Sequence, residues 1–176
     1  MSPQASGLMS CLLFACAGET LAQENAASRL SPVPRLLAEA KRLLPGQPEA
    51  ARSKLEQLLK ADAGSAEGHN LMGTIQETAN DLEGARASYD EAIRLDPGMA
   101  VAYDRRGFVR GNQGATDEAI RDFQEAARLD PRLFDAQYHL GATLWWTKQP
   151  ERALGPLREA VKLRPSHPEA RYYLGL

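Results

Sequence analysis

The chain has 176 residues, of which 43% are hydrophobic and 25% are charged. Its 21 Lys and Arg against 23 Asp and Glu leave a formal net charge of −2, which argues against the basic stripe of a nucleic-acid-binding protein. The composition is that of a globular helical protein, and no apolar stretch reaches the roughly 18 residues that an ordinary membrane-spanning helix needs.

Residues 1–31 differ in kind from the rest of the chain. A short apolar block from Leu8 to Ala17 gives way to a small, polar segment without periodicity. This arrangement resembles a secretory signal peptide that is cleaved after Ala22. We therefore predict a signal peptide or lipoprotein leader over 1–22 and a disordered linker over 23–31.

Three alternatives to cleavage after Ala22 stay open. A second small-residue cleavage site ends at Ala17. The four residues that end at Cys16 resemble a bacterial lipobox, in which Cys16 is lipidated and becomes the mature N-terminus. Residues 1–10 contain no Lys or Arg, so the third alternative is a disordered leader or a misassigned start codon. Both cysteines of the chain lie in this leader, which predicts no disulfide or thiol chemistry in the remainder.

Beyond the leader, one pattern repeats every 34 residues over 66–99, 100–133 and 134–167. Each copy reads as two amphipathic helices joined by a short turn. Counting places from the start of each copy, place 8 is Gly, places 20 and 27 are Ala, place 24 is large and apolar, and place 32 is Pro. These are Gly73, Gly107 and Gly141; Ala85, Ala119 and Ala153; Ala92, Ala126 and Ala160; Tyr89, Phe123 and Leu157; and Pro97, Pro131 and Pro165.

The pattern has a physical reading that the middle copy illustrates. Gly107 and Ala119 allow the two helices to approach closely, and Phe123 fills the space beside them. Ala126 lies where the following unit comes near, and Pro131 ends the second helix because proline has no N–H and restricts the residue before it. Each copy leaves an apolar face uncovered, so the copies must stack into a solenoid.

Two weaker copies flank the three clear ones. Residues 32–65 keep apolar residues at places 20, 24 and 27 but have Glu39 at the Gly place, and they are interpreted as a degenerate first repeat that begins its second helix at Pro48. Residues 168–176 begin another first helix and stop at place 9. We interpret them as a partial repeat and favour a chain that is a fragment of a longer protein.

This pattern resembles the tetratricopeptide repeat (TPR) family, whose signature combines a 34-residue period with small residues and a proline at these places. The resemblance is strong over 66–167 and weak over the rest of 32–176. It implies an all-α fold, a right-handed superhelical solenoid of antiparallel helix pairs with about four repeats and a partial one.

The sequence offers no constellation of residues for catalysis. Three histidines are scattered over separate units, and the pairing of His139 with Asp135 one turn earlier is of a kind that is usually structural. Motifs for zinc, phosphate or a nucleophile are absent from the sequence. We therefore predict no catalytic residue, no cofactor and no metal, and a protein that is not an enzyme.

What remains is a surface. In the TPR family the first helix of each pair lines a concave face, and the resemblance implies a partner-binding groove there, with aromatic residues towards its C-terminal end. The clamp with which some members hold a C-terminal carboxylate is absent. Alternatively, the aromatic residues of the groove pack on one another or on a further repeat. The predicted groove residues are Asn70, Thr74, Glu77, Asp104, Arg105, Phe108, Tyr138, Trp145, Trp146 and Tyr172.

The resemblance implies a non-enzymatic scaffold that binds a peptide or partner protein of unknown identity. The leader adds the expectation of a role in bacterial envelope assembly or secretion, either in the periplasm or anchored to the membrane through a lipid on Cys16. Two alternatives are the N-terminal TPR fragment of a longer enzyme, such as a glycosyltransferase or a sulfotransferase, and a cytoplasmic adaptor.

Overall fold

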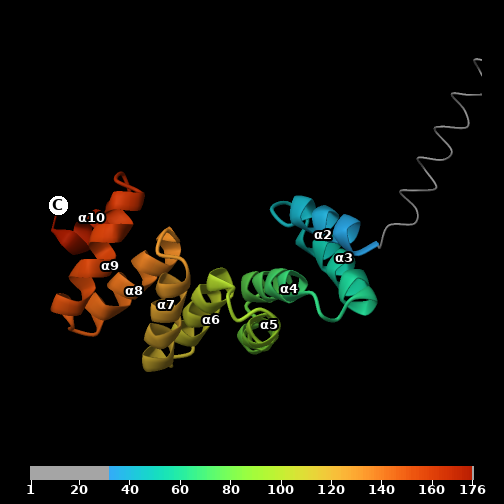
Figure 1. Ribbon diagram of the computed structural model, residues 1–176, viewed down its shortest axis with the longest axis horizontal. Helices are drawn as coiled ribbons and strands as arrows, with labels where there is room; N and C mark the ends of the chain where they lie inside the picture. The colour runs from blue at the N-terminus through green and yellow to red at the C-terminus, as the bar shows by residue number, and fades with distance from the viewer. Residues whose placement is uncertain (1–31, 176) are drawn as a thin grey trace, which may run out of the picture.

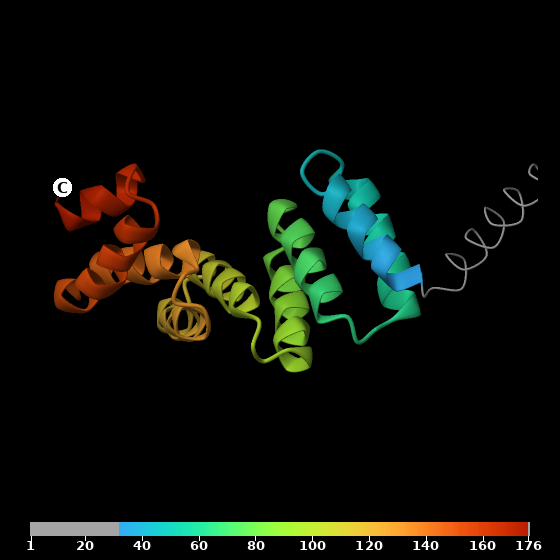
Figure 2. The same cartoon turned by 45° about the horizontal axis from the view of Figure 1, so that its top comes forward.

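The computed structural model describes residues 32–175 as a succession of helix pairs along one long axis (Figures 1 and 2). The predicted leader with Cys16 and the predicted linker lie outside the described residues. Within 32–175 the regular secondary structure consists of helices alone. In chain order these are α2 (Pro32–Leu43), α3 (Pro48–Ala61), α4 (Ala66–Thr78), α5 (Leu82–Leu95), α6 (Ala100–Asn112), α7 (Thr116–Leu129), α8 (Phe134–Trp146), α9 (Pro150–Leu163) and α10 (Pro168–Leu174).

Consecutive helices pack as antiparallel pairs, α2 with α3, α4 with α5, α6 with α7 and α8 with α9. Successive pairs then stack on one another, and the stack forms a right-handed superhelical solenoid. The predicted all-α solenoid fold is therefore confirmed.

Close contacts within each pair explain the glycine at place 8. A Cβ atom on Gly107 would lie 2.8 Å from the Phe123 ring, and one on Gly141 would lie 2.6 Å from Leu157. Gly73 stands in the same relation to Tyr89, with a Cβ distance of 2.6 Å. No side chain fits at these distances, so the large residue at place 24 fills the space that the missing glycine side chain leaves.

Short turns join the two helices of each pair, and in three of them the same place has a left-handed backbone. Asn80, Gly114 and Lys148 have φ angles of 61°, 82° and 62°. This conformation reverses the chain tightly, and it suits glycine and asparagine but is unfavourable for lysine.

The first pair packs on the second through an apolar cluster shared by α2, α3 and α4. Ala40, Leu55 and Ile75 are almost fully buried in it. Glu39, which occupies the glycine place of this pair, forms an ion pair with Lys54 at 2.7 Å. A salt bridge across the helix pair thus replaces the close glycine contact of the other units.

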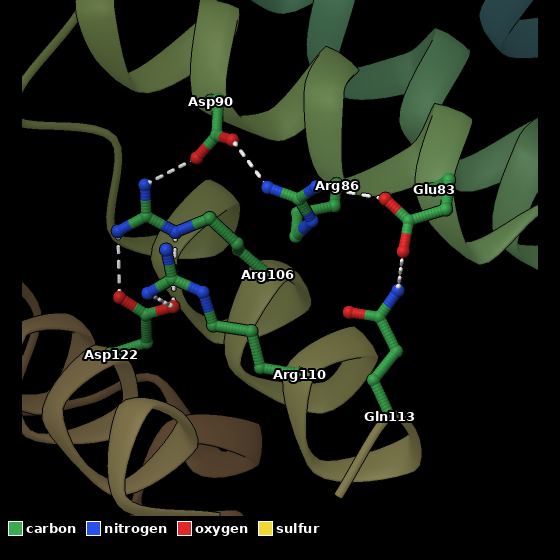
Figure 3. A network of polar contacts seen from close by, with 7 residues as sticks. All are labelled: Glu83, Arg86, Asp90, Arg106, Arg110, Gln113 and Asp122. Atoms are coloured by element: carbon green, nitrogen blue, oxygen red, sulfur yellow. Dashed lines mark hydrogen bonds and ion pairs between the residues drawn. The ribbon is translucent and has the colours of Figure 1, made fainter. Parts of the chain in front are cut away.

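Charged side chains hold the junction between the second and third pairs (Figure 3). Arg106 of α6 contacts Asp90 of α5 at 2.7 Å and Asp122 of α7 at 2.6 Å, and Arg110 contacts the other oxygen of Asp122 at 2.8 Å. The Asp122 side chain is only 5% exposed. Arg86, Glu83 and Gln113 extend this network at its exposed edge. One buried carboxylate therefore joins two arginines and helps to fix three helices.

The short helix α10 covers the end of the last pair. Ala170 is fully buried with Ala160 of α9 and Phe134 of α8, and Tyr173 packs against the core of the preceding units. The His167 side chain caps α10 by accepting a hydrogen bond from the Ala170 N–H at 3.3 Å. This helix places the side chain of Tyr173 beside α8, at the C-terminal end of the predicted groove.

Candidate protein-binding site

The first helices of the units, α4, α6, α8 and α10, contact one another in sequence and form one continuous face, here called the first-helix face. All ten predicted groove residues belong to these helices. Their surroundings divide the face into a polar N-terminal part and an aromatic C-terminal part.

In the polar part the predicted residues bond to one another. Glu77 accepts a hydrogen bond from the Tyr89 hydroxyl at 2.8 Å and pairs with Arg105 at 3.4 Å. Burial raises the pKa of Tyr89 well above its usual range, so its hydroxyl keeps the proton that it donates. The Thr74 hydroxyl donates to the main-chain oxygen of Asn70 at 3.2 Å. This part of the face is therefore occupied by its own interactions.

A histidine and an aspartate connect α8 to α6 in the aromatic part. Nδ1 of His139 lies 2.8 Å from Oδ1 of Asp104, whose side chain is 4% exposed. The imidazole is surrounded by Phe108, Phe123 and Tyr138, with ring centres 5.3–5.6 Å away. Asp135, the carboxylate one turn before His139 in the sequence, forms its ion pair with Arg164 at 3.6 Å instead.

A pocket of about 560 Å³ opens in front of His139. The small residues Gly111 and Ala142 leave the space, and the polar residues of the lining are Asn112, Thr116, Thr143 and Thr147. Burial and the nearby Tyr173 and Glu169 raise the pKa of Tyr138, which keeps its hydroxyl neutral. No Lys, Arg, Asp or Glu side chain belongs to the lining. Its aromatic residues are Phe108, Phe123, Tyr138, Trp146 and Tyr173.

The two tryptophans of the chain have different surroundings. Trp146 is 65% exposed at the edge of the pocket, and its indole N–H donates to the Tyr173 hydroxyl at 3.0 Å. Trp145 is half-buried against the core and packs on Tyr173 at 5.1 Å between ring centres. Tyr172 is 68% exposed and does not line the pocket.

The structure thus brings three of the predicted groove residues, Phe108, Tyr138 and Trp146, into one pocket, with Asp104 directly behind it. Arg105 and the predicted residues of α4 lie in the polar part. Sequence reasoning missed Phe123, His139 and Tyr173 as lining residues. Phe123 has a double role, since the ring that fills the glycine contact in its own pair also forms the pocket wall.

Neither metal binding nor membrane insertion finds support in the described part of the chain. Residues 32–175 contain no group of three or more side chains able to hold a metal ion. Within the same residues, no helix combines the length and apolar character that crossing a bilayer requires. The features that stand out are the pocket and the exposed aromatic residues around it.

Solved structures share this architecture. MamA from Desulfovibrio magneticus RS-1 aligns with a TM-score of 0.70 and 22% identity over 83% of each chain. PilF of Pseudomonas aeruginosa aligns with a TM-score of 0.73 and 21% identity over 81% of this chain and 65% of that one. An O-GlcNAc transferase of Thermobaculum terrenum aligns with a TM-score of 0.69 and 20% identity over 75% of this chain and 26% of its own. At these identities the likeness shows the fold alone.

Family models give the assignment that the structures leave open. A comparison with curated protein sequences found no match. Residues 46–100 match a tetratricopeptide repeat model, and residues 112–146 match a second model described as a TPR repeat. The first segment contains α4 and α5 with Gly73, Ala85, Ala92 and Pro97, and the second contains α7 and α8 with Ala119, Ala126, Pro131 and Gly141. This chain belongs to the tetratricopeptide repeat family.

Proposed function

We propose that the protein is a non-enzymatic scaffold that binds a segment of a partner polypeptide in the aromatic pocket of its first-helix face. The observation that carries the proposal is the pocket itself, an open space of about 560 Å³ walled by five aromatic side chains. Its volume is in the range of roughly 300–1,000 Å³ that is usual for ligand sites.

The exposure of the aromatic residues supports a binding role over a packing role. Phe108 is 38% exposed and Trp146 is 65% exposed, although burial of such rings would be favourable. Aromatic residues dominate the energy of many protein interfaces because they bury a large area with few rotatable bonds. A bound segment would cover both rings and gain that free energy.

Photo-cross-linking tests where a partner binds. A photoreactive amino acid is placed at Ala142 inside the pocket, or at Arg121 on the exposed side of α7 as a matched control, and cross-linked segments are identified by mass spectrometry. We expect a defined partner segment from position 142 alone. Phe108→Ala and Trp146→Ala should abolish this product while thermal unfolding changes little. Equal products from both positions would refute the proposed site.

The proposal includes a place of action in the bacterial envelope. Its support is the apolar block from Leu8 to Ala17 and the lipobox-like residues that end at Cys16. Intact mass of soluble and membrane fractions tests it after expression in a bacterial host. A chain that begins at Cys16 with added acyl mass, or at Gln23 in the periplasm, is the expected result. A chain that keeps residues 1–22 in the cytosol would contradict export.

A second candidate is that these units present substrates to a catalytic domain in the same polypeptide. The observation in its favour is the alignment with the O-GlcNAc transferase, of which this chain spans 26%. Reading the coding sequence beyond residue 176 separates the candidates. A catalytic domain there would favour the enzyme, whereas a stop codon or further repeats would favour the scaffold.

A further inference from the structure

The pair formed by His139 and Asp104 sets the hydrogen-bonding character of one wall of the pocket. A carboxylate can only accept hydrogen bonds, so the 2.8 Å contact places a proton on Nδ1 of His139. In the neutral imidazole the other nitrogen, Nε2, is then an acceptor. Asp104 therefore orients the ring and fixes the tautomer that faces the pocket.

Nε2 is available to a bound molecule. No residue within 32–175 forms a hydrogen bond with this atom. Nε2 is also not fully buried. Among the described side chains that are not exposed, Oδ1 of Asn70 is the one fully buried polar atom without a hydrogen-bond partner, so the unpartnered Nε2 of His139 retains some exposure. Since His139 lines the pocket, the open Nε2 offers a hydrogen-bond acceptor at its wall.

A negative charge lies directly behind the lining of the pocket. No Lys, Arg, Asp or Glu side chain lines it, and Asp104 directly behind the imidazole supplies one negative charge. The faces of aromatic rings are also electronegative. A bound carboxylate would be repelled by this arrangement, and a cation with N–H donors would be attracted.

We propose, on the basis of the function proposed above, that the pocket binds an arginine side chain of the partner polypeptide. The guanidinium stacks on the rings of Phe108, Tyr138 and Trp146 and donates one N–H to Nε2 of His139. The unpaired hydroxyl of Thr143 accepts another. Arginine fits better than lysine because its planar group stacks on aromatic rings and is less strongly hydrated.

The test uses the full chain and short peptides with blocked ends, acetyl-Gly-X-Gly-amide, titrated while the fluorescence of the two tryptophans is followed. X is arginine, citrulline, lysine or tyrosine, and a peptide with a free C-terminal carboxylate is the fifth probe. Citrulline has the shape of arginine without the charge. We expect arginine to bind about tenfold more tightly than citrulline, the contribution of a cation–π contact and a charge-assisted hydrogen bond together.

Two variants test the residues behind this preference. Asp104→Asn keeps the size of the side chain and removes its charge, so the preference for arginine over citrulline should fall several-fold. Phe108→Leu keeps an exposed apolar side chain and removes one ring face, so it reports on the stacking even where Asp104→Asn is unstable. Asp117→Asn, on the exposed first turn of α7, is the matched control and should change neither affinity.

The proposed contact requires the neutral imidazole. A proton on Nε2 would turn this acceptor into a donor and would add a positive charge to the pocket. The ionisable groups that face this ring or the tyrosine beside it are Asp104 from α6, Tyr138 from α8, and Tyr173, His167 and Glu169 from α10 and its cap. α7 contributes the uncharged Phe123.

Several results would overturn this inference. Equal binding of arginine and citrulline would show that charge is not recognised, and equal binding of tyrosine would show an apolar pocket only. Tighter binding of the carboxylate peptide than of the arginine peptide would show that the pocket takes an anion. If any of these occurs while cross-linking from position 142 persists, the arginine inference fails alone. If cross-linking is lost as well, the pocket is not a partner site.

Discussion

The polar and aromatic parts of the first-helix face use the same helix places for opposite purposes. Places 9 and 12 carry Thr74 and Glu77 in α4, and Ala142 and Trp145 in α8. In α4 the Glu77 carboxylate accepts from Tyr89 and the Thr74 hydroxyl donates to the main-chain oxygen of Asn70, so these side chains are occupied by interactions within the protein. In α8 a small residue among large aromatic ones leaves a space that nothing in residues 32–175 fills. A repeated backbone therefore fixes where side chains lie, and the chemistry of each unit decides whether they form a site.

The charged junction beside the polar part is where a single substitution should destabilise the protein most. Asp122→Ala leaves the half-buried Arg106 and Arg110 without their shared carboxylate, and loss of one partner of a buried ion pair costs about 3–5 kcal/mol. Urea unfolding followed by circular dichroism measures it. Glu118→Ala, at an exposed pair with Arg121, should cost less than about 1 kcal/mol. Equal effects would mean that the network adds little to the junction.

The two tryptophans sharpen the distinction between packing and binding in the aromatic part. Trp145 packs on the core, so Trp145→Ala should lower the free energy of unfolding by about 2–3 kcal/mol, less than the loss for a fully buried ring. Trp146→Ala should lower it by less than about 1 kcal/mol, because that side chain is mostly exposed. The reverse order would identify Trp146 as a core residue and remove it from the proposed site. Thermal unfolding of both variants at one pH decides the order.

Two glycines of α6 connect the fold to the pocket. A Cβ at Gly107 would meet the Phe123 ring at 2.8 Å, so Gly107→Ala should destabilise by about 1–2 kcal/mol and push that ring into the pocket. A Cβ at Gly111 would meet Ala119 at an ordinary 3.8 Å, and Gly111→Ala should stabilise by up to about 1 kcal/mol through its helix propensity. Both free energies come from urea unfolding. If Gly111→Ala destabilises the protein as much as Gly107→Ala does, then the whole surface of α6, and not only the contact of Gly107 with Phe123, excludes an added side chain.

The sequence predicted contacts within a unit better than contacts between units. The glycine and its large partner, such as Gly107 and Phe123, lie 16 residues apart in every clear copy, so the period itself reveals them. The pairing of Asp104 with His139 joins place 5 of one unit to place 6 of the next, 35 residues apart. A pattern search within single units cannot find such a pair, because its two members belong to different copies.

That register between units also accounts for the residues at the C-terminal end of the pocket. Tyr138 and Tyr173 have the same separation of 35 residues, and their ring centres lie 6.4 Å apart. Tyr172 occupies place 5 of α10, which would face place 6 of a following unit, and it is exposed. Comparing place 5 with the next place 6 along the sequence would therefore have selected Tyr173 and His139 as lining residues.

The turns provide the smallest and most specific comparison. Place 15 has a left-handed backbone in three units, and its residue is Asn80, Gly114 or Lys148. A side chain in this conformation costs roughly 1–2 kcal/mol, less for asparagine, and glycine avoids the cost. Lys148→Gly should therefore stabilise by about 0.5–1 kcal/mol, since the greater freedom of glycine in the unfolded chain cancels part of the gain. Gly114→Lys should destabilise by a similar amount, and thermal unfolding of the two variants measures both signs. If Lys148→Gly instead destabilises, the contact of the Lys148 ammonium with the Trp145 ring, 6.0 Å from its centre, outweighs the backbone cost, and the lysine stabilises the aromatic part of the face.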